Sequence, residues 1–203
     1  MSKRVYISAD YDTTDGDQEV ADLLNEWGKD KKHRTYFVDT ARVASGSVAN
    51  DEDCRPCDLK EEFNRQINAS SSVIIIVGNR TASRTAGSGC TRHINAQLEC
   101  SCTPYKQNSG GAKACKVKNT SIPGEDDDIG CINSYSYLRH EFEQSRKKNK
   151  NIIVVYNSLY KKSSWLPDYL SGYESLAEPF WVKNGRGDIV GNYQYIKQAL
   201  GYE

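Results

Sequence analysis

Ser72-Val-Ile-Ile-Ile-Val-Gly-Asn79 is a short run of β-branched residues bounded by polar ones. A second such run, Asn151-Ile-Ile-Val-Val-Tyr156, follows the segment Tyr137-Leu-Arg-His-Glu-Phe-Glu-Gln-Ser145, whose apolar residues have helical spacing. Continuous apolar runs of this length are typical of strands buried on both faces of a parallel sheet. The order strand, helix, strand therefore predicts a parallel β-α-β unit. In such sheets ligands bind beyond the carboxyl ends of the strands, so acids near those ends become candidate site residues.

Further strands are predicted on both sides of this unit. Arg4-Val-Tyr-Ile-Ser-Ala9 and Thr35-Tyr-Phe-Val38 are rich in β-branched and aromatic residues and precede the central run. Pro179-Phe-Trp-Val182 can supply a fifth strand after an aromatic-rich tract, residues 165–173, that we expect to be irregular or briefly helical.

Helices are predicted between these strands. Val20, Leu23, Leu24 and Trp27 recur at spacings of three and four, which indicates an amphipathic helix. A second helix is indicated by Leu59, Phe63 and Ile67, with Asp58 as its N-cap, and a closing helix covers 193–200. The alternation predicts an α/β protein with a flavodoxin-like, three-layer doubly wound parallel sheet. We expect one domain over residues 1–203, with a long insertion at about 80–134.

The insertion is polar, rich in Gly, Ser, Thr and Asn, and lies just before the helix that precedes the fourth strand. It contains five of the seven cysteines. Thiolates and an imidazole at such short spacings could hold a structural Zn²⁺, but the spacings match no standard zinc finger. Free thiols are the alternative that we favour, and the metal stays undecided. The cysteines and the nearby histidine are Cys54, Cys57, Cys90, His93, Cys100, Cys102, Cys115 and Cys131.

The charge balance excludes some partner classes. Lys and Arg number 27, as do Asp and Glu, and no basic stripe with interleaved aromatics is present, so a nucleic-acid partner is not expected. No apolar segment approaches the roughly 20 residues of a membrane span, and the N-terminus has no apolar signal region. We therefore expect a cytoplasmic protein without a membrane partner.

Four collinear motifs carry a family resemblance. They are Arg4-Val-Tyr-Ile-Ser-Ala-Asp-Tyr-Asp12, Asp58-Leu-Lys-Glu-Glu-Phe-Asn-Arg-Gln-Ile67, Ser72-Val-Ile-Ile-Ile-Val-Gly-Asn-Arg-Thr81 and Tyr137-Leu-Arg-His-Glu-Phe-Glu143. In this order they resemble the TIR-like family that includes ThsB of Thoeris antiphage systems. The resemblance implies a TIR-type flavodoxin-like fold and cleavage of the nicotinamide-ribose bond of NAD by a glutamate on the helix before strand four. At that motif position this chain has Glu141.

The chemistry of this cleavage suits a single carboxylate. Nicotinamide leaves as a neutral molecule, so no general acid is needed, and the carboxylate faces the positive charge that develops on the ribose. A glutamate on an arbitrary helix is more often an exposed surface residue, but the motif position favours Glu141, which we expect in a solvent-accessible cleft. Glu143 points to another side of the helix and is expected to be a surface residue.

Asp10, Tyr11 and Ser83 are the candidate substrate-binding residues. Asp10 and Tyr11 come directly after the first strand, and the tyrosine ring could stack on a ring of the nucleotide. The loop has three further acids, Asp12, Asp15 and Asp17, and the last two are better explained by helix capping and turn formation. Four acids at a helix N-terminus also disfavour a pyrophosphate there, unless a cation bridges them.

Two functions are compatible with these features. The first is an NAD+ glycohydrolase or ADP-ribosyl cyclase-like enzyme with Glu141 as catalytic residue and NAD as substrate, requiring no cofactor, with the insertion as a lid or specificity element. The resemblance implies that its cyclic or modified ADP-ribose product activates a downstream effector protein. The alternative is a catalytically inactive TIR-like interaction module that self-associates through its helices and loops.

Overall fold

The structure, a computed structural model, describes residues 3–10, 17–39, 56–83, 137–161 and 164–202. The expected insertion therefore lies almost entirely outside the described residues. In chain order the elements are β1 (Lys3–Ser8), α1 (Asp17–Trp27), β2 (Thr35–Asp39), α3 (Pro56–Asn68), β3 (Ser72–Val77), η1 (Thr81–Ser83), α4 (Tyr137–Lys147), β4 (Asn151–Tyr156), η3 (Asp168–Leu170), β5 (Glu178–Pro179), β6 (Trp181–Lys183), β7 (Ile189–Gly191) and α5 (Tyr193–Ala199).

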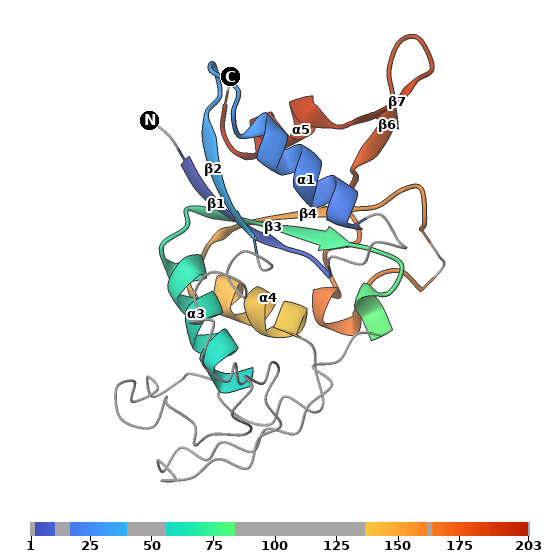
Figure 1. Cartoon of the computed structure of the whole chain (residues 1–203). Helices are drawn as coiled ribbons and strands as arrows, with labels where there is room; N and C mark the ends of the chain where they lie inside the picture. Colours follow the sequence, from blue (N-terminus) through green and yellow to red (C-terminus); the bar gives the residue numbers. More distant parts are fainter. Residues whose placement is uncertain (1–2, 11–16, 40–55, 84–136, 162–163, 203) are drawn as a thin grey trace, which may run out of the picture.

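The main sheet has five strands in the order β2-β1-β3-β4-β5, and all of its neighbouring pairs are parallel. This is the flavodoxin-like order, so the predicted doubly wound fold is confirmed. Helices α1 and α5 cover one face of the sheet, and α3 and α4 cover the other (Figure 1). The order reverses between β1 and β3, which makes the carboxyl ends of these two strands the switch point of the sheet.

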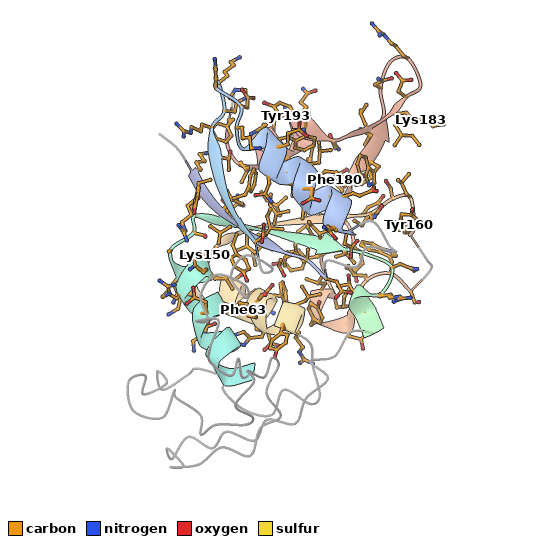
Figure 2. All side chains as sticks on the ribbon, viewed as in Figure 1. Phe63, Lys150, Tyr160, Phe180, Lys183 and Tyr193 are labelled. Carbon is orange, nitrogen blue, oxygen red and sulfur yellow. The ribbon has the colours of Figure 1, made fainter. Side chains whose placement is uncertain are left out.

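The central strand β3 shows why the apolar runs specify this architecture. All six of its residues are buried, and they alternate between the two cores. Ile74 and Ile76 pack on the α1 and α5 side, whereas Val73, Ile75 and Val77 pack on the α3 and α4 side. Each buried side chain of this size stabilises the fold by about 1.5–3 kcal/mol. Figure 2 shows the two layers, with Phe180 in the first and Phe63 in the second.

Two details differ from the sequence-based prediction. The expected fifth strand at 179–182 is split: Glu178–Pro179 pairs with β4, while Trp181–Lys183 leaves the sheet and forms an antiparallel hairpin with β7. Proline has no amide hydrogen, so it suits a short edge strand that ends at that point. Helix α3 begins at Pro56, so Asp58 lies inside the helix and is not its N-cap. Proline is favoured in the first turn, where its missing donor costs nothing.

The connection from α1 to β2 is tight at Gly28. A Cβ atom on this glycine would lie 2.6 Å from the Thr35 carbonyl oxygen and 2.9 Å from the Phe37 ring. The amide of Thr35 donates to the Gly28 carbonyl at 3.2 Å. Only glycine allows this approach of the helix end to the first residue of β2.

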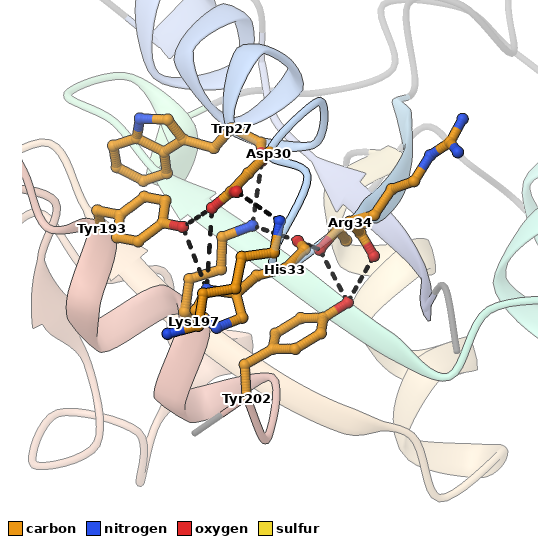
Figure 3. A network of polar contacts seen from close by, with 9 residues as sticks. Trp27, Asp30, His33, Arg34, Tyr193, Lys197 and Tyr202 are labelled. Carbon is orange, nitrogen blue, oxygen red and sulfur yellow. Dashed lines mark hydrogen bonds and ion pairs between the residues drawn. The ribbon is translucent and has the colours of Figure 1, made fainter.

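A polar network attaches α5 to the same connection (Figure 3). Lys197 is only 3% exposed, and its ammonium donates to the carbonyl oxygens of Trp27 at 3.1 Å and His33 at 2.9 Å. Tyr193 donates to the Asp30 carboxylate. Burial lowers the pKa of Lys197, and burial together with the Asp30 hydrogen bond raises the pKa of Tyr193 to about 12. The network anchors the C-terminal helix on the α1 face of the sheet.

We expect Lys197→Met to reduce the free energy of unfolding by about 1–3 kcal/mol, because two carbonyls lose a charged donor while the aliphatic packing is kept. Urea unfolding followed by circular dichroism measures this. Lys183→Met is the matched control, since Lys183 is exposed on β6 and its loss should change stability by less than about 0.5 kcal/mol. Equal effects of the two substitutions would contradict an anchoring role for Lys197.

Candidate functional site

Glu141 lies in the second turn of α4 and is 0% exposed. The hydroxyl of Tyr6, a residue of β1 that is also 0% exposed, donates to Glu141 Oε1 at 3.0 Å. The helix thus places a carboxylate against the face of the sheet that α3 and α4 cover, where a strand residue donates a hydrogen bond to it. A buried carboxylate without such donors would be strongly destabilising.

Helix α4 is held in place by its neighbour α3. His140 Nε2 lies 2.8 Å from Asn64 Oδ1, and Gln144 donates to Asn68 Oδ1 at 3.1 Å. Asn64 and Asn68 are four residues apart on α3, and His140 and Gln144 are four residues apart on α4. The two contacts therefore connect the helices at successive turns. The aromatic tract adds an edge-on contact of Tyr173 with Phe142, with ring centroids 5.5 Å apart. These contacts fix the backbone that carries Glu141.

The burial of Glu141 corrects the expectation of a solvent-accessible cleft. The residue faces inward because α4 packs on the sheet with several consecutive side chains: His140, Glu141 and Phe142 are all buried. Tyr6 makes this burial tolerable by providing a polar partner. Glu143 is different, as expected: its side chain is 40% exposed and pairs with Arg139 one turn earlier at 2.8 Å.

The carboxyl ends of β1 and β3 meet at one edge of the sheet, because these strands are parallel neighbours. Asp10 follows β1 there and is half-buried, and Ser83 ends η1, the short helix after β3. The structure therefore brings the chain positions of Asp10 and Ser83 to the same edge. Tyr11 lies outside the described residues. Glu141 does not lie at this edge, since Tyr6 stands two residues before the end of β1.

An acid of the protein itself already occupies the N-terminus of α1. Asp17, its first residue, is buried, and a Cβ added to Gly78 would lie 2.1 Å from the Asp17 carboxylate. The carboxylate thus packs directly against the backbone at the end of β3. A helix N-terminus often binds phosphate, but a second anion beside this carboxylate would be repelled. This supports the structural role predicted for Asp17.

Tyr6 is the site residue that the sequence did not single out. It is one of several aromatic and β-branched residues in β1, and its pattern is that of an ordinary core residue. Its bond to Glu141 joins positions 135 residues apart in the chain. The sequence does contain one usable signal. Residues two apart on a strand share a face, so Tyr6 and Ser8 place polar atoms on the same face of a strand that is otherwise buried.

A groove of about 1160 Å³ lies elsewhere, along α1 and β2. Its lining includes Glu26, Arg34 and Tyr36, and of the candidate site residues whose side chains the structure describes, neither Asp10 nor Glu141 belongs to it. We therefore do not place the reaction in this groove.

The described residues contain no group of three or more His, Cys, Asp or Glu side chains that could hold a metal ion. Apart from Cys57 in α3, all of the cysteines lie outside them, so the zinc hypothesis stays a prediction. No helix in the part of the chain that the structure describes is long and apolar enough to cross a membrane.

Comparison with known proteins finds a family similarity in the first part of the chain. Residues 6–89 match the family model of the Thoeris protein ThsB, TIR-like domain. The resemblance to the ThsB TIR-like family is confirmed. This ThsB TIR-like segment runs from Tyr6 in β1 past η1 and includes Asp10 and Ser83, whereas Glu141 follows it in the chain.

The crystal structure of a prokaryotic SEFIR domain is also similar, with 14% sequence identity and a TM-score of 0.46. The alignment covers 98% of this chain and 99% of the SEFIR chain. No curated protein matches the sequence.

Proposed function

We propose that this protein is a TIR-like enzyme of antiphage defence that cleaves NAD at the nicotinamide-ribose bond. The observation that carries the proposal is the Glu141 carboxylate, directed from α4 at the sheet and hydrogen-bonded by Tyr6 of the ThsB TIR-like segment. The site thus joins a residue of the family-matched segment to the glutamate on the helix before β4.

The arrangement suits the chemistry of the cleavage. The departing nicotinamide is neutral, and the ribose carbon develops positive charge as the bond breaks, so one fixed carboxylate supplies the main stabilisation. Burial makes that stabilisation stronger, because a charge acts further in a medium of low dielectric constant. No second carboxylic acid is required to protonate the leaving group, in contrast to glycoside hydrolysis.

The rest of the nucleotide would extend from Glu141 toward the carboxyl edge of the sheet. Asp10, Tyr11 and Ser83 are the residues that we propose to contact it there. The N-terminus of α1 is a poor pyrophosphate site, because Asp17 is buried at that position. A pose with the ribose near Glu141 and the phosphates away from α1 satisfies both constraints.

The burial of Glu141 predicts low activity in the resting protein, because NAD reaches a carboxylate that is 0% exposed only in the small fraction of molecules in which the site opens. Activation during infection would then require a rearrangement that admits the substrate. The expected product is a cyclic or otherwise modified ADP-ribose that activates a partner effector protein. The same burial favours the second candidate, a catalytically inactive TIR-like interaction module.

Incubation of the purified protein with NAD distinguishes the two candidates. Micromolar protein should release nicotinamide above the blank over hours, with an equal amount of ADP-ribosyl product, and protein purified from phage-infected cells should do so faster. Chromatography with mass detection follows both products. No release by either preparation would reject the enzyme and favour the interaction module.

A further inference from the structure

We propose that two polar residues on one face of β1 complete the site around Glu141. In this polar row, Tyr6 positions the carboxylate and Ser8 contacts a ribose hydroxyl of the bound nucleotide. The proposal rests on the proposed function and adds two roles to it, one acting on the carboxylate and one on the substrate.

Tyr6 is suited to hold the carboxylate because its own position is fixed. Its strand is paired on both sides, with Val38 of β2 and Val73 of β3 opposite Tyr6. The ring is completely buried in the core between the sheet and α3 and α4. A hydroxyl held this way at 3.0 Å from Glu141 Oε1 limits rotation of the carboxylate. The orientation of the carboxylate determines how its oxygens face a substrate.

The opposite end of the bond is fixed as well. Ser145 donates to the Glu141 carbonyl at 2.6 Å, and the contacts of His140 and Gln144 with α3 hold the turns on either side. With both backbones fixed, the Tyr6 hydrogen bond restricts the torsions of the glutamate side chain. Tyr6 is therefore a positioning residue that does not itself touch the substrate.

Ser8 stands two residues further along β1 and shares the face of Tyr6. Its register partner Ile75 belongs to the same core as Tyr6, which confirms the direction of the side chain. The Ser8 hydroxyl is 0% exposed and has no hydrogen-bond partner among the described residues. Buried polar groups are almost always paired, so an unpaired hydroxyl on this face calls for an explanation.

A sugar hydroxyl accounts for the unpaired serine. Residues two apart on a strand are separated by about 7 Å, a span that one ribosyl group can bridge from the carboxylate held by Tyr6 to Ser8. Ser8 also lies on the side of Tyr6 that leads to Asp10 and the carboxyl edge. A ribose between Glu141 and Ser8 would therefore direct the phosphates toward that edge.

The test compares two conservative variants by kinetics and by unfolding. Tyr6→Phe should lower kcat about 10-fold or more with KM changed less than about 2-fold, and should lower the urea midpoint because Glu141 loses a donor. Ser8→Ala should raise KM about 2- to 10-fold, the worth of one hydrogen bond, with kcat nearly unchanged. Its urea midpoint should stay the same or rise, because the lost hydroxyl has no hydrogen-bond partner in the part of the chain that the structure describes.

Tyr202→Phe is the matched control. It also removes a single tyrosine hydroxyl, one that donates to the Arg34 carbonyl at 2.7 Å on the α1 and α5 side of the sheet. This variant should change neither kinetic constant. A loss of kcat equal to that of Tyr6→Phe would show that the effect of Tyr6 is merely structural and would overturn the positioning role.

The affinity for NAD separates failure of this proposal from failure of the proposed function. In a Glu141→Gln background purified from phage-infected cells, where the site is open and cleavage cannot interfere, calorimetry should show a higher Kd for Ser8→Ala and an unchanged Kd for Tyr6→Phe. If this pattern holds while the wild type releases no nicotinamide, only the proposed function is wrong. If the wild type cleaves NAD and Ser8→Ala changes neither KM nor Kd, only the role of Ser8 is wrong.

Discussion

Glu141→Gln is expected to reduce nicotinamide release from NAD by at least about 10²- to 10³-fold, the usual cost of removing a main electrostatic contact to a transition state. The amide keeps the shape of the side chain and can still accept the Tyr6 hydrogen bond, but it lacks the charge that opposes the developing cation. Stability should be unchanged or higher, because a neutral amide is easier to bury than a carboxylate. Chromatography of nicotinamide and urea unfolding measure the two effects.

Glu143→Gln is the matched control for this prediction. It makes the same chemical change two residues away on α4, at an exposed side chain that forms an ion pair with Arg139. Loss of that pair should cost about 0.5 kcal/mol at most and leave nicotinamide release nearly unchanged. Equal losses of activity in the two variants, or full activity in Glu141→Gln, would reject the assignment of Glu141.

The main sheet could be predicted from sequence because the residues of each strand indicate a strand by themselves, without knowledge of distant contacts. β3 and β4 are continuous apolar runs, which only a sheet covered on both faces can bury, and helical spacing separates them. The connections then leave few alternatives for strand order, because parallel crossovers follow a fixed hand. The observed order β2-β1-β3-β4-β5 is the result.

The C-terminal region was less predictable because its pattern is weak. Pro179, Phe180 and Trp181 are apolar neighbours, and nothing in their order shows that the chain leaves the sheet after Pro179. The two neighbouring residues have different surroundings. Phe180 is fully buried against Trp27, whereas Trp181 belongs to the hairpin. Contacts of this kind depend on the position of α1, which local spacing does not encode.

The site shows the same division between local and distant information. The position of Glu141 on α4 follows from the motif and the helical pattern, both of which are local. Its burial and its bond to Tyr6 follow from packing of α4 on β1, across 135 residues of sequence. A surface glutamate and a buried one have the same helical neighbours in sequence, so the expected cleft could be corrected only in three dimensions.

A small-molecule extract of phage-infected cells that carry this protein is expected to activate the partner effector, whereas an extract of uninfected cells should not. The reason is the burial of Glu141, which predicts little product in the resting state. A low-molecular-weight filter retains proteins and passes nucleotides, so activity in the filtrate would show that the signal is diffusible. The activity of the purified effector, measured after addition of filtrate, gives the result.

Extracts from infected cells with Glu141→Gln should be inactive, and those with Glu143→Gln should be as active as the wild type. This comparison separates a product of the carboxylate from any nucleotide that infection itself releases, because both strains experience the same infection. A dry, enclosed site favours capture of the ribosyl cation by a group of the substrate over attack by water, so a cyclic or modified ADP-ribose should be present. If linear ADP-ribose is the sole product, or if wild-type and Glu141→Gln extracts are equally active, the signalling role is wrong even where NAD cleavage is observed.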